Sequence, residues 1–197
     1  MLRNEELTDL HKVEMTLIGY KLNPEFENIL QGLAKSLNLT MHEICNRLIN
    51  RGTVLHHASQ DKRDHDLADI AGKIRSLMVE STPDGHRTIS CRSKAEYHGS
   101  ITLGVAGGKN NTMRMPDFIV KYIRQEASLH DMTNAEIIFS LIQAGLALLI
   151  TARTENKYKD IAKILWNRTI DNITFEKVGT DTVYHFDFTQ RLSEGKK

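Results

Sequence analysis

The sequence KLNPEFENILQGLAKSLNLTMHEICNRLINRG, from Lys21 to Gly52, recurs without a gap 93 residues later in the chain. The second copy is RMPDFIVKYIRQEASLHDMTNAEIIFSLIQAG, from Arg114 to Gly145. Seven of the 32 aligned positions are identical, and they concentrate at the expected cap, core and turn positions. This concentration indicates one structural unit that is present twice. The identical pairs are Ala34 and Ala127, Thr40 and Thr133, Glu43 and Glu136, Ile44 and Ile137, Leu48 and Leu141, Ile49 and Ile142, and Gly52 and Gly145.

Each copy is expected to form a strand followed by two helices. Residues 16–22 have strand-like alternation, with Ile18, Tyr20 and Leu22 on one face. The next two residues suit the start of a helix, because Asn23 can cap it and Pro24 fits its first position. Apolar residues then recur at helical spacing up to Leu37.

The second helix of each copy begins with the same capping signal. Thr40 is followed three residues later by Glu43, and Thr133 by Glu136. In such a capping box the threonine hydroxyl and the glutamate carboxylate each accept a hydrogen bond from a backbone N–H of the first turn. This is the strongest local signal in the chain.

A strand followed by two helices cannot bury its apolar faces alone, so the two copies are expected to pair. Their strands would form a two-stranded antiparallel ribbon, and the roughly 55 residues between the copies allow this pairing within one chain. One ribbon face would then pack on the helices and the other would face outward. A ribbon of this size fits the major groove of B-DNA, where outward side chains reach base edges.

The doubled pattern resembles the ribbon-helix-helix family of the Arc and MetJ repressors, over residues 17–55 and 110–148. The resemblance implies that outward ribbon residues contact bases in the major groove. It also implies that the N-termini of the second helices, at Thr40 and Thr133, present backbone N–H groups to DNA phosphates. The base-reading positions would be Leu17, Gly19 and Lys21 in the first copy and Asn110, Thr112 and Arg114 in the second.

The six base-reading positions differ in their chemistry. Asn110 and Arg114 suit bidentate contacts to adenine and guanine, whereas Leu17 and Gly19 lack hydrogen-bonding side chains. The first copy is therefore expected to serve mainly as the pairing partner. Asn111 departs from the pattern, since an inward apolar residue is expected there.

Four segments are expected: repeat 1 (15–58), a linker with one helix and short strands (59–107), repeat 2 (108–152), and a C-terminal helix with a β-hairpin (153–197). The linker helix is expected over 62–80, with strands at 88–90 and 101–103, and the C-terminal helix over 157–170. The fold class is mainly α with a small antiparallel ribbon, that is, a tandem ribbon-helix-helix protein.

Composition limits the cellular setting and the partners. The 197 residues have a formal net charge of +1 and include two cysteines, which argues against a tail-driven nucleic-acid binder and against a disulfide-stapled secreted domain. The N-terminal stretch has no signal-peptide pattern, so a cytoplasmic location is expected. The longest uncharged apolar run, residues 137–152, is shorter than the roughly 20 residues that span a bilayer. A buried helix is expected there, and no membrane partner.

Metal-binding and catalytic patterns are weak. Nine histidines include His56–His57, and His98 follows Cys91, but their spacings match no zinc motif. The Gly104–Gly108 run lacks the Lys-Ser/Thr of a phosphate-binding loop. No Ser-His-Asp or paired-carboxylate arrangement has supporting spacing. The chain is therefore expected to be no enzyme and to need no metal or cofactor.

The favoured function is sequence-specific binding of double-stranded DNA, as a transcriptional repressor of the kind common on phages and plasmids. The two repeats would pair as an intrachain pseudo-dimer, with a homodimer as the alternative assembly. Two other functions stay open: an accessory DNA-binding protein for plasmid partition or transfer, and an antitoxin-like protein-interaction module.

Overall fold

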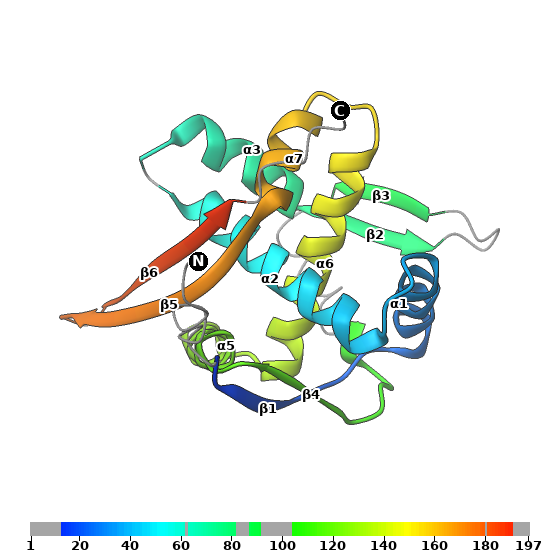
Figure 1. Ribbon diagram of the computed structural model, residues 1–197, viewed down its shortest axis with the longest axis horizontal. Helices are drawn as coiled ribbons and strands as arrows, with labels where there is room; N and C mark the ends of the chain where they lie inside the picture. Colours follow the sequence, from blue (N-terminus) through cyan, green and yellow to red (C-terminus); the bar gives the residue numbers. More distant parts are fainter. Residues whose placement is uncertain (1–12, 62, 82–86, 92–103, 180, 191–197) are drawn as a thin grey trace, which may run out of the picture.

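The computed structural model describes residues 13–61, 63–81, 87–91, 104–179 and 181–190. Within these ranges the chain is mainly helical and carries small two-stranded antiparallel sheets, which confirms that part of the expected class (Figure 1). The elements are β1 (Met15–Tyr20), α1 (Pro24–Ser36), α2 (Met41–Gln60), α3 (His65–Arg75), β2 (Leu77–Ser81), β3 (Arg87–Cys91), β4 (Asn111–Pro116), α5 (Asp117–His130), α6 (Asn134–Arg153), α7 (Lys159–Asn167), β5 (Arg168–Val178) and β6 (Asp181–Gln190).

The helices of the two copies lie at equivalent positions of the repeat, as the alignment predicts. The helices α2 and α6 begin and end at equivalent positions, and each has a complete capping box. The turns that precede them contain the equivalent residues Asn38 and Asp131, both left-handed with a φ of 53°. Asn and Asp tolerate this conformation better than other residues with a Cβ. The first helices differ at their caps: Asn23 caps α1 through its side chain, whereas Pro116 provides no side-chain cap for α5.

Strands β1 and β4 pair antiparallel and lie along the lower edge of the molecule in Figure 1, below α2 and α6. Gly19 lies opposite Thr112, and these two residues are equivalent in the repeat. The ladder continues from this pair to Met15 opposite Pro116, but in the other direction it ends after Tyr20 opposite Asn111. The ribbon is therefore longer on one side of its central pair than on the other.

Helices α2 and α6 cross at two reciprocal glycine contacts. A Cβ added to Gly52 would lie 1.9 Å from the carbonyl oxygen of Leu141, and one added to Gly145 would lie 2.1 Å from that of Leu48. Because Gly52 is equivalent to Gly145 and Leu48 to Leu141, each copy makes the same contact with the other. Such reciprocity is the signature of a two-fold, isologous interface.

The linker and the C-terminal segment differ in part from the expected elements. The helix expected over 62–80 is α3, which ends at Arg75, because residues 77–81 pair with β3 as a hairpin. The strand expected at 88–90 lies within β3, and the run 101–103 lies outside the described residues. Two expected segment boundaries, at 58 and 152, fall inside α2 and α6.

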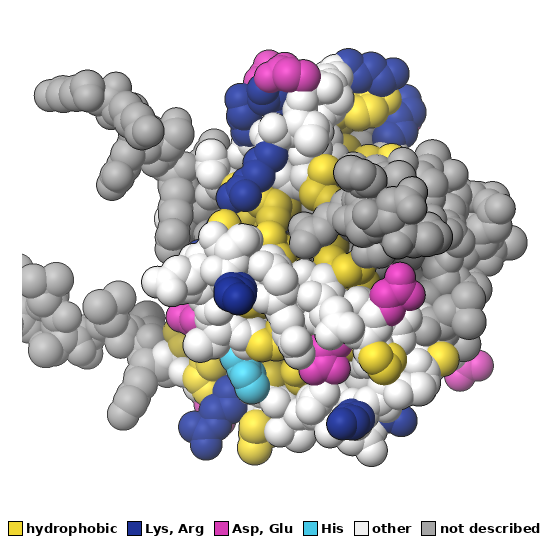
Figure 2. All heavy atoms as spheres, turned by 90° about the vertical axis from the view of Figure 1, so that its right-hand side faces the viewer, with side chains coloured by type: hydrophobic (Ala, Val, Ile, Leu, Met, Phe, Trp, Pro, Cys, Tyr) yellow, Lys and Arg dark blue, Asp and Glu magenta, His cyan; other side chains and the backbone are white. Residues whose placement is uncertain are grey.

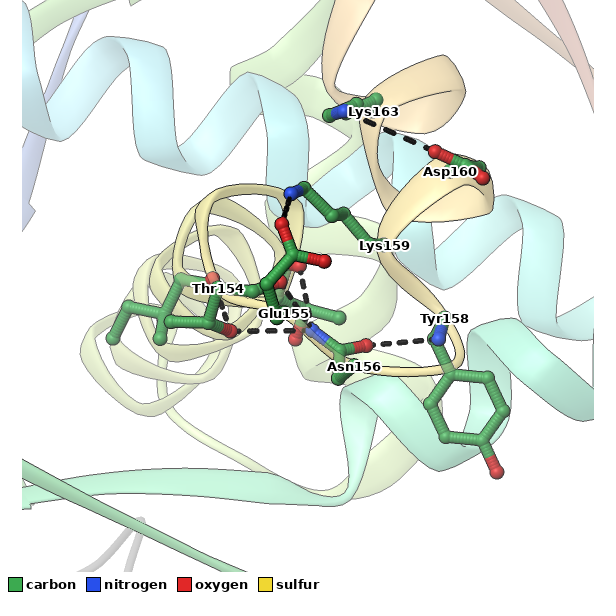
Figure 3. Close-up of polar contacts among 9 residues, drawn as sticks. Thr154, Glu155, Asn156, Tyr158, Lys159, Asp160 and Lys163 are labelled. Atoms are coloured by element: carbon green, nitrogen blue, oxygen red, sulfur yellow. Dashed lines mark hydrogen bonds and ion pairs between the residues drawn. The ribbon is translucent and has the colours of Figure 1, made fainter.

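The C-terminal helix is shorter than expected because a side chain of α2 holds the start of the hairpin. Asn50 Nδ2 donates to the carbonyl oxygen of Ile170, and the N–H of Ile170 donates to Asn50 Oδ1, both at 3.2 Å. Ile170 therefore belongs to β5, and α7 ends at Asn167. The connection before α7 is closed by Asn156, which donates to Thr151 O and accepts from the N–H of Tyr158 (Figure 3).

Helix α6 lies in the middle of one hydrophobic core that includes residues of all four segments. By length and composition it is the one helix in the described residues that could cross a membrane. In the fold, 78% of its most apolar stretch is buried, against α2, α7 and other elements. The expectation of a buried helix over 137–152 is confirmed.

One corner of the core is polar where the other repeat is apolar. The buried His56 imidazole of α2 lies between two side chains, with Tyr122 Oη 2.6 Å from Nδ1 and Gln60 Nε2 2.8 Å from Nε2. Glu126 Oε2 is 3.7 Å from Nδ1. The positions equivalent to His56, Tyr122 and Glu126 in the other copy are the apolar residues Leu149, Ile29 and Leu33.

We expect this corner to make the protein acid-sensitive. Burial above all, and then the electrostatic influence of Arg75, His130 and His57, lowers the pKa of His56 to about 3. The unfolded chain therefore binds a proton at His56 below about pH 6.5, whereas the folded chain does not. The contribution of His56 to the free energy of unfolding is complete above that pH. It declines as the pH falls, by about 2 kcal/mol between pH 7 and pH 5. Urea unfolding at both pH values measures this loss, and His56→Leu should remove most of it. An equal loss in His56→Leu would assign the acid sensitivity to other groups.

Candidate nucleic-acid interface

The outer face of the β1–β4 ribbon is open to solvent, whereas its inner face is part of the core. Ile18 and Tyr20 of β1, and Met113 and Met115 of β4, are buried. The alternate residues are exposed, as the pleat of a strand requires. The inward and outward faces are those expected from the sequence.

Four of the predicted base-reading residues form the centre of this outer face. Leu17 lies directly opposite Arg114, and Gly19 lies directly opposite Thr112. All four are exposed. Directly opposed residues on one face of an antiparallel pair have Cβ atoms about 5 Å apart. The two cross-strand pairs, Leu17 with Arg114 and Gly19 with Thr112, are therefore neighbours on the outer face of the ribbon.

Lys21 and Asn110, the other two predicted positions, are exposed but lie outside the ladder. β1 ends one residue before Lys21, and β4 begins one residue after Asn110. The physical reason is the polar start of the second strand, since Asn111 stands where the first copy has the buried Ile18. The chain nevertheless stays close at this end: a Cβ added to Gly108 would lie 2.4 Å from the carbonyl oxygen of Leu22.

The two helix N-termini predicted to bind phosphate are capped by the protein itself. Glu43 Oε2 accepts from the N–H of Thr40 at 2.7 Å, and Glu136 Oε2 accepts from that of Thr133 at the same distance. The backbone and side-chain hydrogen bonds from Thr40 lower the pKa of Glu43, so its carboxylate is charged at neutral pH. A carboxylate beside the N-terminus opposes a second anion there. The expected phosphate contact is therefore weaker than at an uncapped helix.

Two polar side chains of α2 hold β4 and were not singled out from the sequence. His42 Nε2 lies 3.1 Å from the carbonyl oxygen of Thr112, and Asn46 Nδ2 donates to that of Arg114 at 3.2 Å. The equivalent positions in α6 are Ala135 and Phe139, which cannot make these contacts. This difference is visible in the repeat alignment. Side chains of α2 therefore hold the edge of β4, whereas the equivalent side chains of α6 cannot hold β1 in the same way.

At the other end of the ribbon, the structure ties the strands to the start of α5. Thr16 Oγ1 donates to Asp117 Oδ1 at 2.9 Å, and the N–H of Asp117 donates to Glu14 O at 2.8 Å. Lys121 pairs with the same carboxylate at 2.6 Å. The Lys121 and Thr16 hydrogen bonds lower the pKa of Asp117, so this carboxylate is also charged and paired.

Positive and negative side chains are mixed on the face of the molecule that Figure 2 shows, with Lys and Arg interspersed with Asp and Glu. This agrees with a formal net charge of +1. Among the predicted base-reading residues Arg114 and Lys21 are the cations, and the neighbouring Lys109 is exposed as well.

A hollow lies beside the ribbon, between α5 and the C-terminal hairpin. It measures about 910 Å³ and is lined by Phe118, Lys121, Asp171, Ile173, Phe175 and Asp187, among other residues. Its lining mixes apolar side chains with carboxylates and one lysine. No group of three or more His, Cys, Asp or Glu side chains in the described ranges is arranged to hold a metal ion. His98 lies outside those ranges.

The chain was compared with protein-family models, with curated proteins and with solved structures, and none of them matches it.

Proposed function

We propose that this chain is a tandem ribbon-helix-helix protein that binds double-stranded DNA by inserting the β1–β4 ribbon into the major groove. The observation that carries the proposal is the pairing of equivalent residues: Gly19 opposite Thr112 in the ribbon, and reciprocal Gly–Leu contacts between α2 and α6. A two-stranded ribbon packed against two helix pairs is the arrangement that the resemblance implies. A role as a transcriptional repressor follows from the same resemblance.

The chemistry of the outer face supports the proposal. Arg114 can donate two parallel hydrogen bonds to O6 and N7 of guanine. Thr112 can hydrogen-bond to a base through its hydroxyl group or contact the methyl group of thymine through its own methyl group. Arg114→Ala should weaken binding to the preferred site by about 1–3 kcal/mol and relax the preference at one guanine. Lys21→Ala should have a smaller and less selective effect, because an ammonium group lacks the planar fork of arginine. Binding of both variants to a randomised duplex library measures these effects.

Gly19 offers the sharpest test of groove insertion. Its Cβ position is open, with the nearest atom, Asn111 O, 3.9 Å away, so a side chain can be added without disturbing the fold. Gly19→Glu would place a carboxylate at the centre of the ribbon and should weaken DNA binding about tenfold or more, since like charges at an interface cost several kcal/mol.

Gly72→Glu on α3 is the matched control, because it adds the same charge at a position with no atom of another element within 4 Å. It should leave DNA binding within about twofold, since a single charge remote from the interface is largely screened. If both variants bind DNA as the parent does, the ribbon does not enter the groove.

A second candidate, the antitoxin-like interaction module, is favoured by the C-terminal hairpin. Phe175, Val178 and Val183 are exposed there by 43%, 53% and 38%. Exposed apolar side chains on a projecting hairpin suit a protein partner. The salt dependence of affinity separates the two functions: log K falls linearly with log salt for a phosphate-neutralising DNA binder. A chain that binds no DNA sequence above background would support the interaction module.

A further inference from the structure

We infer that the ribbon reads the C5-methyl group of a pyrimidine through Leu17, at a base pair next to the guanine contacted by Arg114. This inference rests on the proposed DNA-binding function. It adds that one half of the DNA site must carry a C5-methyl group at a defined position. It assigns a reading role to the strand whose outward residues lack hydrogen-bonding groups.

The first observation is the exposure of the apolar side chains along β1. Leu17 is 57% exposed and Met15 is 48% exposed. These residues alternate along the chain, so they fall on the same outward side as Gly19. The outer face of β1 therefore presents two apolar side chains, Met15 and Leu17, where a base-reading strand would be expected to present polar ones.

The second observation is the cross-strand partner of Leu17. Arg114 lies directly opposite it, at a separation of about 5 Å between Cβ atoms. Stacked base pairs are about 3.4 Å apart along the DNA axis, so side chains at this separation reach neighbouring base pairs. The only apolar group on the major-groove edge of a base is the methyl group at C5 of thymine, and 5-methylcytosine presents the same group. Leu17 beside Arg114 therefore fits a methylated pyrimidine beside a guanine.

The third observation is the asymmetry of the ribbon. The ladder is formed on the side that carries Leu17 and Arg114, whereas it ends before Lys21 and Asn110 on the other side. Asn46 donates to the carbonyl oxygen of Arg114 and fixes this part of β4 to α2. The half of the ribbon that carries Met15 and Leu17 is thus also the half in which the strands pair over the greater length and Asn46 holds β4. The other half carries an amide and an ammonium, so the two half-sites should differ in sequence.

The test uses the full chain and its preferred duplex from a randomised library. At each position next to the guanine that depends on Arg114, the duplex is made with thymine, uracil, cytosine or 5-methylcytosine, each with its complementary base. One position should bind about fourfold more tightly with the methylated base than with its unmethylated analogue, which is the factor expected for burial of one methyl group. If the discrimination is found only between thymine and uracil, thymine is the base that is read. If it is found only between 5-methylcytosine and cytosine, 5-methylcytosine is the base that is read.

Leu17→Ala tests the residue assignment. It should bind the methylated duplex about fourfold more weakly, and it should lose the discrimination between methylated and unmethylated bases. Leu129→Ala, at a leucine 52% exposed in the last turn of α5, is the matched control and should keep the discrimination. Thermal unfolding checks that both variants retain the parental stability.

Two results would overturn the inference while leaving the proposed function intact. In the first, the protein selects a DNA sequence but binds uracil and cytosine duplexes as tightly as their methylated forms. In the second, the discrimination persists in Leu17→Ala, which would place methyl recognition on another residue. Failure to select any DNA sequence would instead overturn the proposed function itself.

Discussion

Replacing Gly52 or Gly145 with alanine should lower the free energy of unfolding by about 3 kcal/mol or more, because overpacking against backbone atoms leaves no flexible group to move. The added Cβ atoms would lie 1.9 Å from Leu141 O and 2.1 Å from Leu48 O. Helices α2 and α6 would have to separate at the point where they cross. Separation would disturb the most extensive helix contact in the described part of the protein.

Gly72→Ala on α3 is the control for this prediction. No atom of another element lies within 4 Å of its Cβ position, so only the helix propensity of the residue changes. Alanine is favoured over glycine in a helix interior by about 1 kcal/mol, so this variant should be stabilised. Chemical denaturation of the three variants measures the difference. A stabilised Gly52→Ala would mean that the helices do not approach as closely as they do in the structure.

The repeat explains why much of the fold could be predicted from the sequence. Once the two copies were aligned, Thr40 and Thr133 fixed the starts of two equivalent helices, and alternation around Ile18 fixed the inward face of the first strand. These are local signals, set by capping geometry and by the periodicity of apolar residues. Both are readable without knowledge of the tertiary contacts.

The features that the sequence did not predict depend on contacts between distant residues. The end of α7 is set by Asn50, which is 120 residues away from Ile170. The hairpin of β2 and β3 replaces the last turn of the expected linker helix, because the strands gain a pairing partner. The anchoring of β4 by His42 and Asn46 likewise needs the relative placement of the two repeats. Local propensity cannot supply that placement.

The candidate site shows the same division. The outward positions of Leu17, Gly19, Thr112 and Arg114 follow from strand alternation and were predictable. The early end of the ladder, which leaves Lys21 and Asn110 beyond it, depends on Asn111 taking the place of an apolar residue. Asn111 is visible in the sequence as an exception to the apolar pattern. Its effect on strand pairing, a ladder that extends further on one side of the Gly19–Thr112 pair than on the other, is not.

The shared core of the two copies predicts that Leu48→Ala and Leu141→Ala each cost about 2–5 kcal/mol, the range for removing a fully buried leucine side chain. Leu48 is 0% exposed and Leu141 is 3% exposed, and each lies one turn before the glycine contact of its helix. Because the two positions are equivalent in the repeat, their losses should be of similar size. Leu129→Ala, at an exposed position of α5, should change stability by less than about 0.5 kcal/mol. Urea unfolding of the three variants decides the matter. Losses below about 1 kcal/mol at both buried positions would contradict a common core between α2 and α6, and with it the pairing of the two repeats.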